Sequence, residues 1–215
     1  MKRLAALTRP KRSLIRKWIG YLAKNYINFI SICLLLCSIF YFVSIQRVRM
    51  ATLSSNPELF TDGEMVEVVR AIDGDEVRIK NSQGGTRLRI LGIKSFDASE
   101  RDMLLTEYGK IAVDYLEQEV VGKRAKLLVA EKRVDNKGRL LATLILEDNN
   151  ADVAKTMVTD GLTLVYTKFS FPAMDDYLAA QNLAQSKKTG LWQNDRVAVR
   201  AQSMRNVWDQ ERNNR

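Results

Sequence analysis

The chain has 215 residues and a formal net charge of +9, and it contains no histidine. The missing histidine excludes His general bases, Ser-His-Asp and Cys-His triads and His metal ligands. Both cysteines, Cys33 and Cys37, lie in one apolar run near the N-terminus, which excludes a disulfide framework and Cys-rich zinc sites. Any chemistry therefore falls to carboxylates, Arg, Lys, Tyr or a bound ion.

The positive charge is concentrated at the N-terminus. Residues 1–57 hold ten basic residues and no acidic one, which leaves 24 basic against 25 acidic residues for 58–215, a net charge of −1. Proteins that grip phosphates usually carry a surplus of Lys and Arg. The distribution therefore favours membrane association or targeting over nucleic-acid binding.

The first 45 residues predict a membrane anchor. Residues 1–25 form a basic segment without acids, and 26–45 are twenty residues without a charge, enough for a helix to cross a hydrocarbon core of about 30 Å. Eight basic residues precede this run, so the positive-inside rule predicts the N-terminus on the matrix or cytoplasmic side and the folded domain on the opposite side. The basic segment resembles a retained mitochondrial presequence, which favours the mitochondrial inner membrane. A bacterial inner membrane is the alternative.

The folded part begins after a linker at 46–63. Two alternating apolar stretches within 64–80 flank an Asp-Gly-Asp turn and predict a β-hairpin. Residues 86–93 alternate again and predict a third strand. Apolar residues at helical spacing over 102–121 then predict a helix.

The second half of the domain predicts two more strands and two helices. The strands are 125–134 and 139–146, joined by a turn with glycine. The helices are 152–160 and 172–192, and a polar tail at 195–215 is compatible with a further helix.

This order of elements predicts an α+β, mainly β, fold class. Five strands with a helix between the third and the fourth are typical of an OB-fold barrel. We therefore expect a five-stranded OB-fold barrel with three helices over 64–194, preceded by one transmembrane helix.

Several short blocks within the domain point to a known family. They are Ala71-Ile72-Asp73-Gly74-Asp75, Arg89-Ile90-Leu91, Tyr108-Gly109, Asp135 with Gly138-Arg139, Gly161-Leu162 and Gly190-Leu191-Trp192. Together, and by their spacing, they resemble the staphylococcal nuclease (thermonuclease-like) family over about 64–194.

The resemblance implies a calcium-dependent nuclease site. In that family two acidic side chains and a backbone carbonyl hold Ca²⁺, two arginines clamp the phosphate, and a glutamate helps to orient the attacking water, as phosphoryl transfer requires. Asp75 matches the first metal carboxylate, and Arg89 and Arg139 match the two arginines. Lys94 stands where the second metal carboxylate is expected, and Asp97 stands where the glutamate is expected.

Lys94 is predicted to break this metal site. An ammonium about 4 Å from Ca²⁺ repels it by a few kcal/mol, and it could instead form a salt bridge with Asp75. Asp97 reaches about 1.3 Å less far than a glutamate, and a misplacement near 1 Å can cost roughly 10²-fold in rate.

The other site residues also have structural explanations. Without a metal, Arg89 would be a strand charge or a partner of Asp97. Arg139 would equally be a partner of Asp135. Tyr166 falls in a region where family members stack a base, but core packing is the expected role.

Two functions are favoured on these residues, and metal-free binding of nucleic acid through the barrel face is a third that the charge balance disfavours. The first is a membrane-anchored, catalytically degenerate domain that serves as an interaction or accessory subunit of a membrane protein complex, with the membrane and other subunits as partners and no cofactor. The alternative is a Ca²⁺-dependent nuclease acting on DNA or RNA, with nucleic acid as partner, and Asp75, Arg89 and Arg139 favour it.

Overall fold

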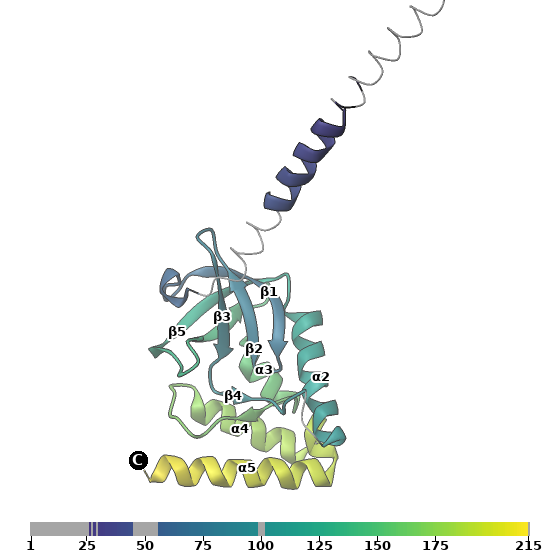
Figure 1. The fold of residues 1–215 in the computed structure, drawn as a ribbon. Helices are drawn as coiled ribbons and strands as arrows, with labels where there is room; N and C mark the ends of the chain where they lie inside the picture. The colour runs from purple at the N-terminus through teal and green to yellow at the C-terminus, as the bar shows by residue number, and fades with distance from the viewer. Residues whose placement is uncertain (1–25, 27, 29, 45–55, 99–101, 215) are drawn as a thin grey trace, which may run out of the picture. The chain divides into compact units, whose positions relative to one another are not determined.

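The structure is a computed structural model that describes residues 26, 28, 30–44, 56–98 and 102–214 (Figure 1). The chain divides into two compact units, Met1–Met50 and Ala51–Arg215. The first unit contains the segment for which an anchor is predicted, and the second contains all the strands among the described residues.

The prediction of a single-pass membrane protein is wrong, because no helix in the described part of the chain is long and apolar enough to cross a membrane. The predicted localisation in the mitochondrial or a bacterial inner membrane is therefore corrected with it. The basic segment 1–25 and the linker residues 46–55 lie outside the described residues.

Five strands of the second unit close into a barrel (Figure 1), which confirms the predicted OB-fold. In order around the barrel they are β1 (Met65–Asp73), β2 (Glu76–Lys80), β3 (Gly85–Ile90), β6 (Leu140–Leu146) and β5 (Arg124–Val134). Neighbouring strands are antiparallel except β3 and β6, which run parallel. A short 3-10 turn, η1 (Pro57–Leu59), precedes β1.

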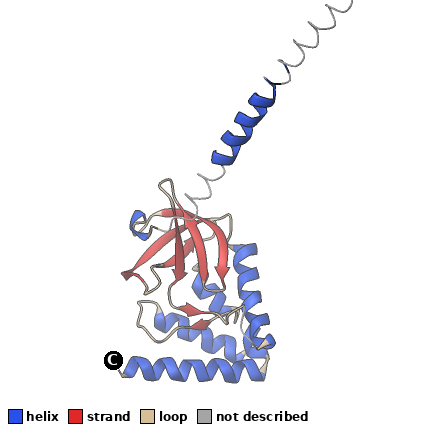
Figure 2. Cartoon of the chain, in the orientation of Figure 1, coloured by secondary structure: helices blue, strands red, loops and turns tan. Residues whose placement is uncertain are grey.

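Three helices occur at their predicted places in the order of elements, α2 before β5 and the other two after β6. They gather along one side and one end of the barrel (Figure 2). They are α2 (Met103–Glu119), α3 (Val153–Thr159) and α4 (Met174–Ser186). The side chain of Asp102 accepts from Leu104 N at the start of α2, and Asp152 accepts from Lys155 N at the start of α3. These caps satisfy N–H groups that a first helical turn leaves unpaired, so they fix where each helix begins.

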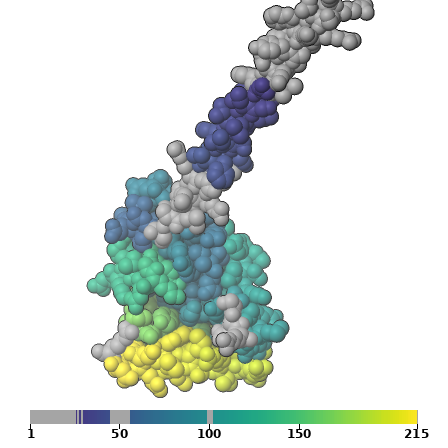
Figure 3. Space-filling view, viewed as in Figure 1, coloured from purple at the N-terminus to yellow at the C-terminus, as the bar shows by residue number. Residues whose placement is uncertain are grey.

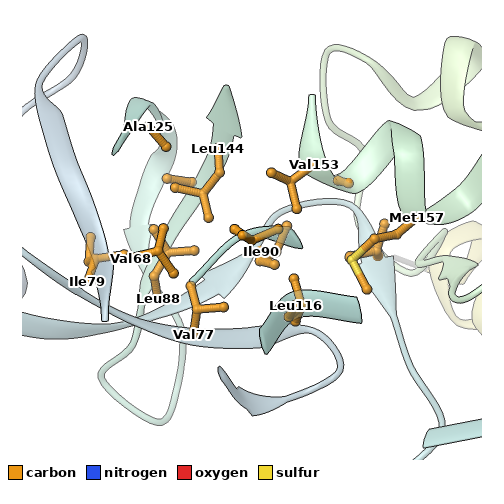
Figure 4. Packing of buried hydrophobic residues seen from close by; sticks show 14 of the residues in the cluster. Val68, Val77, Ile79, Leu88, Ile90, Leu116, Ala125, Leu144, Val153 and Met157 are labelled. Atoms are coloured by element: carbon orange, nitrogen blue, oxygen red, sulfur yellow. The ribbon is translucent and has the colours of Figure 1, made fainter. Parts of the chain in front are cut away.

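The core fills the barrel and the layer beneath its helices. Along β6 every second residue is buried, as expected for a strand with one face on a core. Figure 4 shows strand side chains turned toward one another and toward side chains from α2 and α3. The labelled ones are Val68, Val77, Ile79, Leu88, Ile90, Leu116, Ala125, Leu144, Val153 and Met157. The alternation in the sequence therefore translates directly into one continuous core.

The predicted third strand is shorter than expected. It ends at Ile90 because Gly92 turns the chain with φ +82°, a conformation that glycine adopts without strain. The next residues form a separate strand, β4 (Ile93–Lys94), which pairs with β7 (Leu164–Val165). This two-stranded sheet lies outside the barrel.

The predicted helix at 172–192 is also shorter. Lys188 and Gly190 have φ values of +51° and +58°, which a right-handed helix does not accommodate. The helix α4 therefore ends at Ser186, and a 3-10 turn, η2 (Gly190–Gln193), follows.

The polar tail forms a helix, α5 (Asp195–Asn213), capped by the side chain of Asn194. Its buried residues Val197 and Ala201 join a second hydrophobic cluster. The other buried members of that cluster are Phe96, Leu105, Leu164, Ala184, Leu191 and Trp192. Figure 3 shows α5 as a continuous layer across one end of the barrel domain, so the helix packs on the domain along its length.

Candidate functional site

The Asp-Gly-Asp turn between β1 and β2 places Asp75 in the interior. A Cβ added at Gly74 would lie 2.6 Å from Ala112 Cβ and 2.7 Å from Ser95 Cβ, so only glycine lets the turn pack this closely against α2 and the segment after β4. Asp75 is 1% exposed as a result. A carboxylate this deeply buried needs close cationic or N–H partners.

Arg89 on β3 supplies the first of these partners. Its guanidinium forms an ion pair with the Asp75 carboxylate, and it also donates to the backbone oxygens of Asp75 at 2.9 Å and Ile93 at 2.6 Å. The Arg89 side chain is 10% exposed. Arg89 is thus bound to Asp75 and to the backbone.

Lys94 supplies the second partner. Its Nζ lies 2.9 Å from Asp75 Oδ2, and the Ser95 backbone N–H donates to the same oxygen at 3.0 Å. The salt bridge expected between Lys94 and Asp75 is therefore present. The pairing of Lys94 with Leu164 in the β4–β7 sheet sets its position.

These contacts determine how Asp75 titrates. Burial alone would raise the pKa of Asp75, but the charges of Arg89 and Lys94 outweigh burial, and the pKa lies below its usual value. Asp73 behaves in the opposite way, because burial and then the Asp75 charge raise its pKa. Asp75 is therefore an ionised carboxylate with both oxygens engaged.

A second ionic group surrounds Glu76, the first residue of β2. Glu76 is 3% exposed, and its carboxylate pairs with Arg139 Nη1 at 2.6 Å and with Arg87 Nε at 2.5 Å. Arg139 also donates to Asp135 Oδ2 at 2.7 Å through Nε, so the partnership expected between Arg139 and Asp135 is present. Both family arginines are thus held by carboxylates of this chain.

The charges of this second group stabilise one another. Burial alone would raise the pKa of Asp135, but hydrogen bonds from Arg139 and from Lys137 N–H leave it below its usual value. Burial would lower the pKa of Arg139, whereas Asp135 and Glu76 raise it overall. Arg139 therefore stays fully charged inside a closed salt-bridge network.

Asp97 lies in the segment after β4. It is exposed, beyond the buried Phe96, and its charge contributes to the raised pKa of Asp73. The position expected for the catalytic glutamate is thus occupied by an exposed carboxylate.

The residues at Asp75 do not fit a calcium ion. Calcium takes six to eight oxygen ligands, mostly carboxylates and carbonyls. Here one Asp75 oxygen faces a guanidinium and the other faces the Lys94 ammonium. In the ranges that the structure describes, no group of three or more His, Cys, Asp or Glu could hold a metal ion.

Sequence reasoning missed the role of Glu76. It sits directly opposite Arg89 in the β2–β3 register and shares an outward face with Arg87, so alternation along the predicted hairpin and third strand carried a signal for a cross-strand ion pair. The contact with Arg139 spans 63 residues of sequence, and only the closed barrel brings the two together.

The fold and this site define the class of protein. A closed five-stranded OB-fold barrel with a buried aspartate in its first hairpin turn and two strand arginines beside it is the frame of a staphylococcal-nuclease-like domain. The sequence model of the family described as "Staphylococcal nuclease homologue" matches residues 87–194. The chain belongs to this family.

Relatives of known name support the same assignment. An "Uncharacterized endonuclease" of Escherichia coli O157:H7 is 30% identical over 125 residues, which cover 58% of this chain and 74% of that protein. A "Thermonuclease" of Staphylococcus intermedius is 29% identical over 135 residues, which cover 61% of this chain and 77% of that protein. "Protein ParB" of Escherichia coli is 30% identical over 158 residues, which cover 69% of this chain and 81% of that protein.

Proposed function

We propose that this chain is a staphylococcal nuclease homologue that does not cleave by the calcium mechanism and that serves as an interaction or accessory subunit of a protein complex. One observation carries the proposal: Lys94 Nζ lies 2.9 Å from Asp75 Oδ2, at the position where the family resemblance implies a metal carboxylate. The chain's own ammonium thereby takes the place of the cation.

Electrostatics argue against calcium entering beside Lys94. Two unit charges about 4 Å apart interact with about 4 kcal/mol at an effective dielectric of 20, and a divalent ion doubles that repulsion. Moving Lys94 aside would also remove one of the cations that offset the burial of Asp75. Calcium would therefore have to displace a stable pair before gaining any ligand.

The phosphate arginines are engaged as well. Arg89 holds the Asp75 carboxylate and two backbone oxygens, and Arg139 holds Asp135 and Glu76. A phosphodiester would have to compete with these carboxylates for the same N–H donors. This supports a structural role for both arginines.

The region where family members stack a base is also covered. Tyr166 packs edge-on against Trp208 of α5, with ring centroids 4.9 Å apart, and against Phe169 at 5.9 Å. A base that stacked on Tyr166 would compete with Trp208. The helix α5 begins after residue 194, where the family match ends.

The second candidate is a Ca²⁺-dependent nuclease acting on DNA or RNA. It is favoured by the names of the relatives, two of which are an endonuclease and a thermonuclease, and by the presence of Asp75, Arg89 and Arg139 at the family positions. Under this alternative Lys94 would have to leave Asp75 when the metal binds.

A calcium-dependent cleavage assay on the full chain separates the two candidates. Wild type, Arg139→Ala and Lys94→Asp are incubated with single-stranded DNA and with RNA, with Ca²⁺ or with a chelator, and calcium binding is measured by calorimetry. We expect no cleavage and no calcium binding by wild type, and calcium binding by Lys94→Asp, because that change replaces the repelling ammonium by a ligand.

The control is Lys80→Asp, which makes the same change in charge at an exposed pair with Glu67 and should not create calcium binding. Cleavage by wild type that depends on calcium and is lost in Arg139→Ala would overturn the proposal and establish the nuclease.

A further inference from the structure

The helix α5 is held unevenly along its length. Its buried residues Val197 and Ala201 both lie in its N-terminal half, where they join the second hydrophobic cluster. The structure describes every residue of α5, and none after Ala201 is buried. Residues 205–213, here called the strap, end next to the C-terminus marked in Figure 1. The strap is therefore attached to the domain by partly exposed side chains.

The first attachment of the strap is aromatic. Trp208 packs edge-on against Tyr166 in the loop after β7, with ring centroids 4.9 Å apart. Tyr166 in turn contacts Phe169, whose ring centroid lies 5.9 Å away and which is 45% exposed. The aromatic surface of this loop thus extends into solvent, and aromatic surfaces of this kind are common anchors for protein partners.

Two polar contacts complete the attachment. Lys168 Nζ pairs with Glu211 Oε2 at 2.8 Å, and the two side chains are 26% and 44% exposed. Arg212 Nη1 donates to Thr167 O at 2.9 Å. Ion pairs with this much exposure contribute little to stability. The strap residues that make the aromatic and polar contacts follow an i, i+3, i+4 spacing, which places them on one helix face.

The same junction contains polar atoms that protein groups leave unpaired. Within the described part of the chain, three buried atoms here have no hydrogen bond: Arg205 Nε and Asp209 Oδ1 on the strap and Thr167 Oγ1 in the loop. Asp209 Oδ1 has an ion pair with Arg212 Nη2 at 3.4 Å, which is longer than an ordinary hydrogen bond. Burying an unpaired polar atom costs free energy that hydration recovers. Release of the strap is favoured to that extent.

We propose that the strap is releasable and that the loop beneath it, residues 166–169, is a docking site for an amphipathic helix of a partner protein. The partner helix presents the pattern of the strap itself, an aromatic residue followed three and four positions later by an acid and a base. Its acid pairs with Lys168 and its base donates to Thr167 O after the strap has left. The proposal rests on the interaction role given under Proposed function and names the chemistry of the partner.

The strap then acts as a competitor within the chain. A partner helix binds only the fraction of molecules whose strap is released, so the strap weakens the apparent affinity by that fraction. Contacts that hold the strap, such as Trp208 on Tyr166, therefore set how strongly a partner must bind.

The contacts of the strap favour a helix over nucleic acid. The loop offers one acceptor, Thr167 O, and one cation, Lys168, and the strap satisfies them with a base and an acid. A phosphate backbone supplies acceptors but no donor for a carbonyl oxygen. The net charge of −1 over residues 58–215 also disfavours a polyanion.

The test measures binding of a labelled peptide copy of the strap to the full chain by fluorescence anisotropy. The peptide has the sequence of residues 202–215. The chains are wild type, Trp208→Ala, which loosens the strap, and Val207→Ala, a matched control because Val207 lies on the strap and is 50% exposed. Circular dichroism of each chain confirms that it is folded.

We expect the peptide to bind the Trp208→Ala chain about 30-fold more tightly than wild type or the Val207→Ala chain, because the loosened strap raises the fraction of open sites. A peptide with Trp208→Ala should not bind, whereas a peptide with Val207→Ala should bind like the unchanged one. Equal binding to the wild-type and Trp208→Ala chains, or binding to neither, would overturn the strap and leave the cleavage assay untouched.

A charge reversal tests the place of the partner's acid. Lys168→Glu, added to the Trp208→Ala chain, should weaken peptide binding about fivefold, and a peptide with Glu211→Lys should restore the affinity. Failure of this rescue would overturn the assigned contact with Lys168.

Other occupants of the loop have their own signatures. A concentration-dependent dimer of wild type in light scattering that is lost in Trp208→Ala would overturn the partner helix and assign the loop to a second copy of the chain. Oligothymidylate that binds the Trp208→Ala chain more tightly than the peptide does would assign the loop to nucleic acid instead. Calcium-dependent cleavage by wild type would overturn the proposed function, whichever peptide result accompanied it.

Discussion

At the scale of single residues, Asp75 shows how a buried charge is kept in place. Three donors meet its two oxygens, from Arg89, Lys94 and the Ser95 backbone. Removing the carboxylate would leave a guanidinium and an ammonium facing each other with nothing between them. Removing one partner of a buried ion pair destabilises a protein far more than replacing both partners by apolar residues does.

We therefore expect Asp75→Asn to lower the free energy of unfolding by about 3 kcal/mol, the lower end of the range for one removed partner of a buried pair. Glu67→Gln is the control, because Glu67 and Lys80 form a pair with side chains 44% and 46% exposed, and exposed pairs contribute about 0–1 kcal/mol. Urea denaturation measures both. Equal losses in the two variants would contradict the account of Asp75 as a buried charge.

At the scale of elements, two glycines join α3 to the segment after α4. Gly161 and Gly190 have φ values of +64° and +58°, and the Leu191 N–H donates to Gly161 O at 2.8 Å. A Cβ at Gly161 would lie 2.2 Å from Thr189 O. The two glycine blocks that the sequence shares with its family are thus the two sides of one close backbone contact.

Gly161→Ala should therefore destabilise the domain by about 3 kcal/mol, because it adds a backbone clash to the strain of a positive φ. Gly122→Ala separates the two effects: Gly122 has φ +81° but no atom within 4 Å of an added Cβ, so only about 1 kcal/mol is expected. Thermal unfolding of both variants measures the two losses of stability. A larger loss in Gly122→Ala than in Gly161→Ala would refute the role given to the backbone clash at Gly161.

The helix α5 is the element that extends beyond the family match. Trp208 holds its C-terminal half by packing on Tyr166, while Arg212 Nη1 donates to Thr167 O at 2.9 Å. The adjacent Val207 is 50% exposed. Trp208 and Val207, although adjacent on α5, should thus contribute very differently to the stability of the domain.

We expect Trp208→Ala to cost about 2 kcal/mol and to raise amide hydrogen exchange in the last two turns of α5. Val207→Ala should change the free energy of unfolding by less than about 0.5 kcal/mol. If both variants exchanged like wild type, the aromatic contact would not be what holds the helix end.

At the scale of the whole molecule, the balance between carboxylates with lowered and with raised pKa values determines the response to acid. The pKa values of Asp75 and Asp135 lie below their usual values, so as pH falls below about 4 the unfolded chain takes up protons first and the stability that these groups contribute is lost. Asp73 and Asp160 have raised pKa values, and their contribution has the opposite sign: it is present at low pH and lost as pH rises.

Asp135→Asn should therefore flatten the decrease in the free energy of unfolding below about pH 4, and Asp160→Asn should steepen it. Urea denaturation at a series of pH values measures both slopes. Two variants that shifted the acid limb in the same direction would show that the sign assigned to one of these groups is wrong.

Much of the fold could be predicted from local patterns. Alternation in β1, β2, β5 and β6 follows directly from which residues face the core, and the caps at Asp102 and Asp152 mark where helices begin. The pattern could not show that the third strand ends at Ile90, because the β4–β7 pairing joins residues about seventy positions apart. The apolar N-terminal run, taken alone, led to the incorrect prediction of a membrane anchor.

The sequence by itself determined the family, the barrel and the identities at the site, because short blocks such as Asp73-Gly74-Asp75 have local steric requirements. It also showed that Lys94 stands at a ligand position. Only the tertiary structure decided what these charges bind: Arg89 and Lys94 converge on Asp75, and Arg139 reaches Glu76. Ion pairs depend on distances of a few ångströms between residues far apart in sequence, and closing the barrel fixes those distances.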